Sequence, residues 1–172
     1  MASTGMTGTL AGRTDRRCPR IGPVTTGITF IRPPGLHDGV PYAYAAVTDP
    51  GRTLFTAGAC PLDADGRTVG VGDVTGQARQ VMANLVTVLE AAGAALTDVV
   101  KTTVYVASTD RADLVAAWQV VRECFGDHDA PSTLLGVAVL GWPDQLVEVE
   151  AVAVRDTWRE PDPPADASTV AP

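Results

Sequence analysis

The stretch that decides the fold spans residues 130–154 and reads APSTLLGVAVLGWPDQLVEVEAVAV. A Gly-Trp-Pro-Asp turn joins two apolar runs, and the second run alternates with a period of two, which predicts a β-strand. Because alternate residues of a strand face opposite sides, we expect Glu148 and Glu150 on one face and Val147 and Val149 on the other. An ionised carboxylate is costly to bury, so the glutamate face should meet water, a partner chain or a ligand.

The composition is typical of one globular domain. The chain has 172 residues, 45% of them hydrophobic and 19% charged, so it can bury a sizeable core. Its net charge of −7 and its pI near 4.6 argue against nucleic acid and anionic membranes as partners. No run reaches the roughly 18 apolar residues of a membrane helix.

The three cysteines, Cys18, Cys60 and Cys124, are odd in number and irregular in spacing. The N-terminal residues contain no continuous apolar segment of the kind found in secretory signals. We therefore expect reduced thiols and a cytoplasmic protein.

Composition also divides the chain into three parts. Residues 1–22 are rich in Ser, Thr, Gly and Arg, and residues 156–172 are rich in Pro, Ala and Asp. We expect both to be disordered tails, the alternative for the first being an arm that docks on a neighbouring subunit. Residues 23–155 then form the folded domain.

Within this domain the pattern predicts the element order β-β-β-α-β-α-β-β. Strands are expected at 25–32, 42–47, 52–57 and 99–106, in addition to the two strands of the opening stretch. Helices are expected at 73–92 and 110–125, where apolar residues recur at helical spacing. Each helix leaves and returns to strands, so we expect both on one face of a mixed sheet. The other face should be apolar and buried against further copies of the chain.

General motifs of nucleotide, metal and acyl-enzyme sites are absent from the sequence. It has no Walker A loop, no GxGxxG loop, no Gly-x-Ser-x-Gly elbow and no cysteine spacing suited to zinc. No motif therefore indicates a nucleotide, metal or acyl-enzyme site. Glu148 is the leading candidate for a general acid or base, the alternative being a solvated or paired strand glutamate.

The other candidate site residues each have a structural alternative. Ser132 and Thr133 are candidates for binding a ligand or orienting water, against ordinary strand and turn chemistry. Cys60 is an accessible loop thiol or an inert small hydrophobe. Tyr42 and Trp118 line an apolar pocket or pack in the core.

The two histidines, His37 and His128, are open in role. His128 lies in the sequence Gly-Asp-His-Asp, so we expect a surface histidine whose pKa is raised by the flanking aspartates. Whether either histidine supplies a cation to the site is left open by the sequence.

Three stretches resemble the Rid/YjgF family of reactive-intermediate deaminases. They are LFTAGACPLDADG (residues 54–66), DVTGQARQVMANLVTVLEAAGAALTDVVKTTVYVAS (residues 73–108) and the two runs of residues 130–154. The resemblance covers about residues 41–155. It implies a chorismate-mutase-like α+β fold and a homotrimer with ligand clefts between subunits. It also implies hydrolysis of 2-imino and 2-enamino acids to 2-oxo acids and ammonia, without a metal or organic cofactor.

The resemblance also assigns site residues. The family's strand glutamate, which helps to hold the attacking water, corresponds to Glu148, its tyrosine to Tyr42, and the glycine of its Ser-Gly pair to Gly58. Three positions depart from the family pattern. Ala57 stands in place of the serine of the Ser-Gly pair, Ser132 stands where an arginine grips the substrate carboxylate, and Trp118 stands where asparagine is common. Serine cannot replace the bidentate, charge-assisted contact of an arginine, so we expect a more apolar cleft for a neutral or bulkier ligand.

Two functional hypotheses of different classes follow. The first is an enzyme that acts on a small imine or enamine near Glu148, with an altered substrate range. The second is a trimer that binds a small molecule without turning it over. A third, ribonuclease activity, is disfavoured by the acidic pI and the lack of a basic groove.

Overall fold

The computed structural model describes residues 27–37 and 39–155; the predicted tails, residues 1–22 and 156–172, lie outside the described residues. The predicted order of strands and helices is confirmed, with one 3₁₀ turn added before the fourth strand. The elements are β1 (Ile28–Ile31), β2 (Ala45–Thr48), β3 (Arg52–Phe55), α1 (Val74–Ala91), η1 (Leu96–Asp98), β4 (Val99–Val106), α2 (Arg111–Phe125), β5 (Ser132–Gly136) and β6 (Val147–Arg155).

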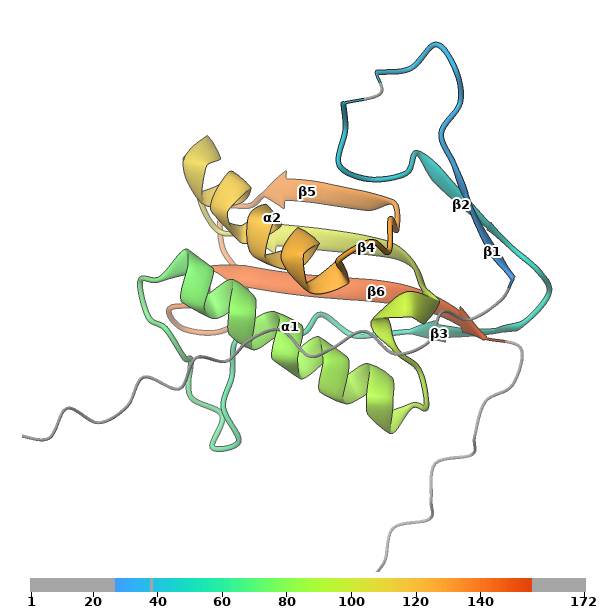
Figure 1. The fold of residues 1–172 in the computed structure, drawn as a ribbon. Helices are drawn as coiled ribbons and strands as arrows, with labels where there is room; N and C mark the ends of the chain where they lie inside the picture. The colour runs from blue at the N-terminus through green and yellow to red at the C-terminus, as the bar shows by residue number, and fades with distance from the viewer. Residues whose placement is uncertain (1–26, 38, 156–172) are drawn as a thin grey trace, which may run out of the picture.

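A four-stranded mixed sheet in the order β3-β6-β4-β5 forms the centre of the fold (Figure 1). β4 and β5 run parallel, whereas β6 is antiparallel to both β3 and β4. Among the strands of the described residues, β1 and β2 pair only with each other, as a two-stranded antiparallel ribbon beside this sheet. β1 is shorter than the predicted strand at 25–32, and β2 begins later than the predicted strand at 42–47. Tyr42 and Tyr44 consequently precede β2 instead of lying within it.

Both helices cover one face of the sheet, as predicted (Figure 1). The inward residues of β6 are at most 2% exposed and pack with apolar side chains of both helices. The core includes Val147, Val149, Ala151 and Ala153 from β6, Val81, Met82, Leu85 and Leu89 from α1, and Val120, Val121 and Phe125 from α2. Glu148 and Glu150 alternate with these buried residues and face away from the helices.

Local capping explains where the helices begin and end. Asp73 accepts a hydrogen bond from Gly76 N at 2.9 Å, and Asp110 accepts one from Ala112 N at 2.8 Å. These are N-caps, which satisfy backbone donors that have no partner within the first helical turn. Gly126 follows α2 with a φ of 57°, a backbone conformation that glycine adopts without strain.

The sheet face away from the helices, here called the open face, is mixed in character. It carries Phe55, Lys101, Thr103, Tyr105, Thr133, Glu148 and Glu150. Phe55 is 74% exposed, Lys101 Nζ donates to Thr133 Oγ1 at 2.5 Å, and Tyr105 donates to Glu150 Oε1 at 2.9 Å. The expectation of an apolar uncovered face is thus only partly right, because charged and hydroxyl side chains alternate with the apolar ones.

Within the described residues, neither helix combines the length and the apolar character that crossing a membrane requires.

Candidate functional site

Glu148 lies on β6 where the strand passes the loop that follows β3. Ala59 N donates to Val149 O at 2.8 Å and Val149 N donates to Ala59 O at 3.2 Å, so the loop runs beside β6 as a short bridge. This pairing brings Gly58 against Glu148. A Cβ atom at residue 58 would lie 1.8 Å from Glu148 Oε1, so the carboxylate can take its position only beside a glycine.

Two side chains reach the other carboxylate oxygen. Gln145 Nε2 donates to Glu148 Oε2 at 2.9 Å, and the thiol of Cys60 lies 3.7 Å from the same oxygen. Burial and the negative charge of Glu148 raise the pKa of the Cys60 thiol, against the opposing contacts of Gln145 and Trp142. The thiol proton of Cys60 has two acceptors in reach, Gly58 O at 3.6 Å and Glu148 Oε2 at 3.7 Å. Since the thiolate is the nucleophilic form, the raised pKa makes Cys60 a weak nucleophile.

A buried glutamine of α1 holds the turn that presents Gln145. Gln77 is 0% exposed; its Nε2 donates to Asp144 O at 2.7 Å, and its Oε1 accepts from Leu146 N at 2.6 Å. Both neighbours of Gln145 are thus fixed to the helix. Asp144 has a φ of 58°, which is uncommon outside glycine and reverses the chain at this point.

Asn84, two turns further along α1, holds the opposite loop. Its Nδ2 donates to Cys60 O at 2.7 Å and to Leu62 O at 2.9 Å, and Gln80 Nε2 donates to Asn84 Oδ1 at 2.9 Å. Amide side chains of one helix therefore support both loops around Glu148. Sequence reasoning missed these supports, although amides on the buried face of an otherwise apolar helix were a usable signal.

A second group of predicted residues lines an open groove of about 550 Å³ at the free edge of β5. Its lining is Pro41, Tyr42, Trp118, Ser132, Thr133 and Leu134. The rings of Tyr42 and Trp118 meet edge to face, with centroids 6.0 Å apart. Ser132 Oγ accepts from Thr102 Oγ1 at 2.7 Å. The groove thus offers aromatic rings and hydroxyl groups, and none of its described lining residues is charged.

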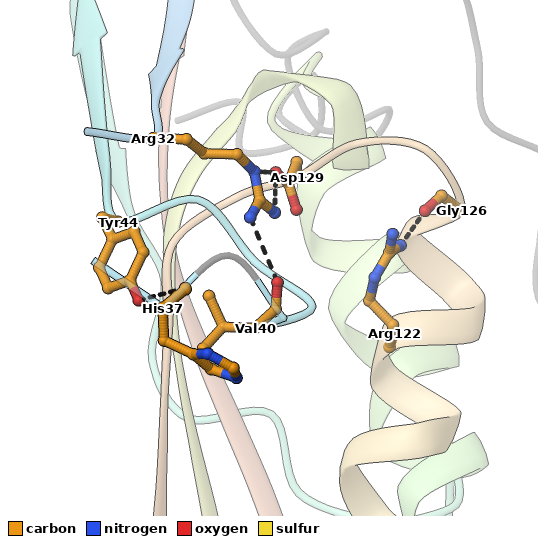
Figure 2. Close-up of polar contacts among 7 residues, drawn as sticks. All are labelled: Arg32, His37, Val40, Tyr44, Arg122, Gly126 and Asp129. Atoms are coloured by element: carbon orange, nitrogen blue, oxygen red, sulfur yellow. Dashed lines mark hydrogen bonds and ion pairs between the residues drawn. The ribbon is translucent and has the colours of Figure 1, made fainter. Parts of the chain in front are cut away.

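Two arginines near the groove are engaged elsewhere, as Figure 2 shows. Arg32 donates to Asp129 Oδ2 through Nε at 2.9 Å and Nη2 at 2.6 Å, and through Nη1 to Val40 O at 3.2 Å. Arg122 donates to the carbonyl of Gly126. Neither guanidinium lines the groove, so neither takes the place of the arginine that the resemblance expects at residue 132.

The histidines also lie outside the groove lining. His37 is exposed, and its carbonyl accepts from Tyr44 Oη at 2.6 Å. His128 is half-buried, with Nε2 2.7 Å from Val99 O and its ring edge to face with Phe30 at 4.9 Å. Burial lowers the pKa of His128 despite the nearby carbonyl and aspartates. The prediction of a surface histidine with a raised pKa is therefore wrong, because desolvation outweighs the aspartates.

The two groups of predicted site residues do not meet within one protomer. β4 lies between β5 and β6, so Ser132 and Glu148 are two strands apart, about 10 Å across the sheet. They are also offset along it, since Ser132 pairs with Thr102 and Glu148 with Tyr105. Thr133 likewise contacts Lys101 and not Glu148. A role for Ser132 or Thr133 beside Glu148 thus stays a prediction that requires a second copy.

The cysteines differ in state. Cys60 is a free thiol, Cys124 is disulfide-bonded, and Cys18 lies outside the described residues. The expectation that all thiols are reduced is therefore wrong for Cys124. In the part of the chain that the structure describes, no group of three or more His, Cys, Asp or Glu side chains is placed to hold a metal ion.

Comparisons with known proteins identify the family. Residues 39–155 match a family model described as Endoribonuclease L-PSP. A RutC family protein of Pyrococcus horikoshii is 36% identical over 113 residues, which are 66% of this chain and 87% of that protein. A 2-iminobutanoate/2-iminopropanoate deaminase of Salmonella typhimurium is 36% identical over 114 residues, 65% of this chain and 87% of that protein.

A solved structure supports the same grouping. A protein of unknown function in the Rid family of Yersinia pestis shares 36% of its residues and superimposes with a TM-score of 0.69, covering 75% of this chain and 99% of that one. The family model spans most of the described residues, and sequence and fold point the same way. The chain therefore belongs to the Rid/YjgF family, whose model carries the description Endoribonuclease L-PSP, and it has the chorismate-mutase-like fold of that family.

Proposed function

We propose that this protein hydrolyses a small imine, or an enamine after its conversion to the imine, in a cleft that contains Glu148. The single observation that carries the proposal is the placement of this carboxylate. Its Oε2 is bonded to Gln145, whereas Oε1 lies against Gly58 and has no hydrogen-bond donor among the described residues. A held carboxylate with one available oxygen suits a general base. The deaminase relative in Salmonella supports the reaction class.

The reaction balances with water as the only co-reactant. The water oxygen attacks the imine carbon while Glu148 Oε1 accepts a proton from that water. Glu148 gives this proton to the former imine nitrogen, and the hydroxyl proton of the resulting carbinolamine follows it. The C–N bond then breaks, ammonia leaves, and the carbonyl product and the free carboxylate remain. An enamine enters the same sequence after protonation at carbon gives the imine.

The groove supports a neutral or bulky substituent on the substrate. Its described lining has the rings of Tyr42 and Trp118 and the hydroxyls of Ser132 and Thr133, without a cation to pair with a carboxylate. A 2-imino acid would bring an unpaired carboxylate to this groove, whereas an uncharged imine would not.

The same proposal includes self-association into a trimer. Within one protomer the groove and Glu148 lie two strands apart, so a complete site needs the groove of one copy beside Glu148 of the next. The exposed Phe55 on the open face supports contact between copies, because a large exposed apolar side chain on a sheet is favourably covered.

The test is the substitution Glu148→Gln, which keeps the shape of the side chain and removes its basicity. Imines are made in the assay by an amine oxidase or an amino-acid oxidase, with catalase present, and carbonyl release is followed. We expect kcat/KM of the variant to be at least about 100-fold lower than that of the wild type. The wild-type protein should act faster on uncharged imines than on 2-imino acids. Full activity in the variant would show that Glu148 is not the base.

A second candidate is a protein that binds a small molecule without turning it over. Ser132 favours it, since the groove lacks the cation that would grip and orient a 2-imino acid. This candidate predicts no acceleration of imine hydrolysis over buffer, together with a ligand-dependent rise in melting temperature. Wild-type turnover would exclude it.

Ribonuclease activity, which the description of the family model names, is opposed by the net charge of −7. A protein that neutralises RNA phosphates needs basic side chains on one surface. Tight RNA binding near physiological salt would contradict this.

A further inference from the structure

The two oxygens of Glu148 have different surroundings. Oε2 receives Gln145 Nε2 at 2.9 Å and lies 3.7 Å from the Cys60 thiol. Oε1 lies over Gly58, where none of the described residues donates to it. A carboxylate on a freely rotating side chain would exchange these positions. Here the contacts distinguish one oxygen from the other.

Gln145 is itself held on every side. It is 4% exposed; its Oε1 accepts from Trp142 N at 3.0 Å, and its Nε2 also approaches Val147 O at 3.3 Å. Gln77 binds the backbone on both sides of it, at Asp144 and Leu146. A buried amide whose donor and acceptor groups are both bonded is confined to one orientation.

Gln145 lies apart from the groove. It is not among the residues that line the groove, and its side-chain contacts run to Glu148, to the Cys60 thiol and to the backbone of its own turn. Any effect of Gln145 on a reaction must therefore pass through Glu148 or the thiol and not through direct contact with the bound substituent.

We propose that Gln145 is a positioning residue, which holds Glu148 by Oε2 and so makes Oε1 the oxygen that takes the proton from water. The inference rests on the proposed function, because it gives Oε1 a part in hydrolysis. Displacement of a reacting group by about 1 Å can cost about 100-fold in rate, so a donor that fixes the carboxylate is a kinetic requirement.

The first test is Gln145→Met, which keeps the length of the side chain and removes the donor. We expect kcat on the imine substrate to fall about 10- to 100-fold while KM stays within about twofold. The matched control is Gln119→Met, the same change at an exposed position of α2, which should leave both constants unchanged. Circular dichroism shows whether each variant is folded.

The second test uses the Cys60 thiol as a reporter that needs no turnover. The rate of alkylation by iodoacetamide, measured against pH, gives its pKa, with Cys60→Ser as the background. Glu148 raises this pKa more than Gln145 lowers it. In Glu148→Gln the pKa should fall. If Gln145 positions Glu148, Gln145→Met should also lower it, since the carboxylate moves away.

The outcomes separate the two proposals. Unchanged kcat in Gln145→Met overturns the positioning role, and so does a rise in the Cys60 pKa, which would mean that Gln145 only contacts the thiol. If the wild-type protein hydrolyses no imine but Gln145→Met lowers the Cys60 pKa, the proposed function is overturned and the positioning of Glu148 by Gln145 is supported. If Gln145→Met does not fold, Gln145→Glu replaces it, because the glutamate keeps an acceptor for Trp142 N. This variant is tested by kcat and KM only, since its added negative charge acts directly on the pKa of the Cys60 thiol.

Discussion

Gly58 is the residue whose identity depends most directly on a neighbour. Its Cα lies so close to Glu148 Oε1 that an added Cβ would approach to 1.8 Å. The resemblance assigned Gly58 and Glu148 to one site, and the structure supplies the physical reason: the glycine makes room for the carboxylate.

Gly58→Ala should therefore damage both the site and the fold. We expect a loss of about 1–3 kcal/mol in the free energy of unfolding from overpacking, with a drop in kcat of at least about tenfold. Urea denaturation and steady-state kinetics measure the two effects. Gly141→Ala is the control, because a Cβ there meets no atom within 4 Å. Wild-type kcat in Gly58→Ala would mean that Glu148 does not need its observed position.

His128 gives a residue-scale prediction for pH. Burial lowers the pKa of His128 in the folded protein below its value of about 6.5 in the unfolded chain. At a pH between these two pKa values, the unfolded chain therefore binds more protons than the folded protein does. The free energy of unfolding should therefore fall as pH drops from 7.5 to 5.5. His128→Gln, whose amide can still donate to Val99 O, should show a smaller fall in urea titrations at the two pH values. An equal fall in both proteins would place the titrating group elsewhere.

At the scale of elements, α1 connects the core to the site. Its apolar residues pack in the core, while Gln77 and Asn84 bind loops on either side of Glu148. These amides belong to one face, since residues three, four or seven apart on a helix lie above one another. The helix thus sets the distance between the two loops.

Gln77→Leu tests this support. It leaves Asp144 O and Leu146 N without their side-chain partner, and a buried polar group without a partner costs about 1–3 kcal/mol. We expect the free energy of unfolding to drop by about 2–5 kcal/mol in urea titrations. Gln119→Leu, at an exposed position of α2, should change it by less than about 0.5 kcal/mol. A similar small change for Gln77→Leu would show that water replaces the lost contacts.

The sequence predicted these elements unevenly. The β-branched run gave β4 its observed bounds, and Asp110 and Gly126 marked the ends of α2, because such signals are local. The ribbon of β1 and β2 was harder, since the segment around it is fixed by distant contacts such as Arg32 with Asp129, 97 residues away. Gln145 had no signal of its own: its importance depends on the register that brings Gln77 to the turn.

At the scale of the whole molecule, the site residues predicted from sequence fall into two places. Glu148, Gly58 and Cys60 meet at one, and Tyr42, Trp118, Ser132 and Thr133 line the other. A sequence pattern can nominate such residues, but whether they meet depends on packing between strands and between copies of the chain.

Self-association should therefore control activity. Phe55→Glu places a charge on the open face where an apolar side chain is 74% exposed, so we expect smaller species in sedimentation velocity and a parallel loss of kcat/KM. Val88→Glu, at an exposed position of α1, is the control and should alter neither. A monomeric Phe55→Glu variant with full activity would show that one copy holds the whole site.

Thr133 belongs both to the open face and to the groove. Its side chain accepts the Lys101 ammonium on the open face, and the same residue forms part of the groove wall. A copy that covers the open face therefore also fixes one wall of the groove. Under the proposed assembly, ligand occupancy and protomer association become linked equilibria: each must strengthen the other by the same factor. Apparent ligand affinity should then rise with protein concentration, and a saturating ligand should shift assembly to lower concentrations of chain.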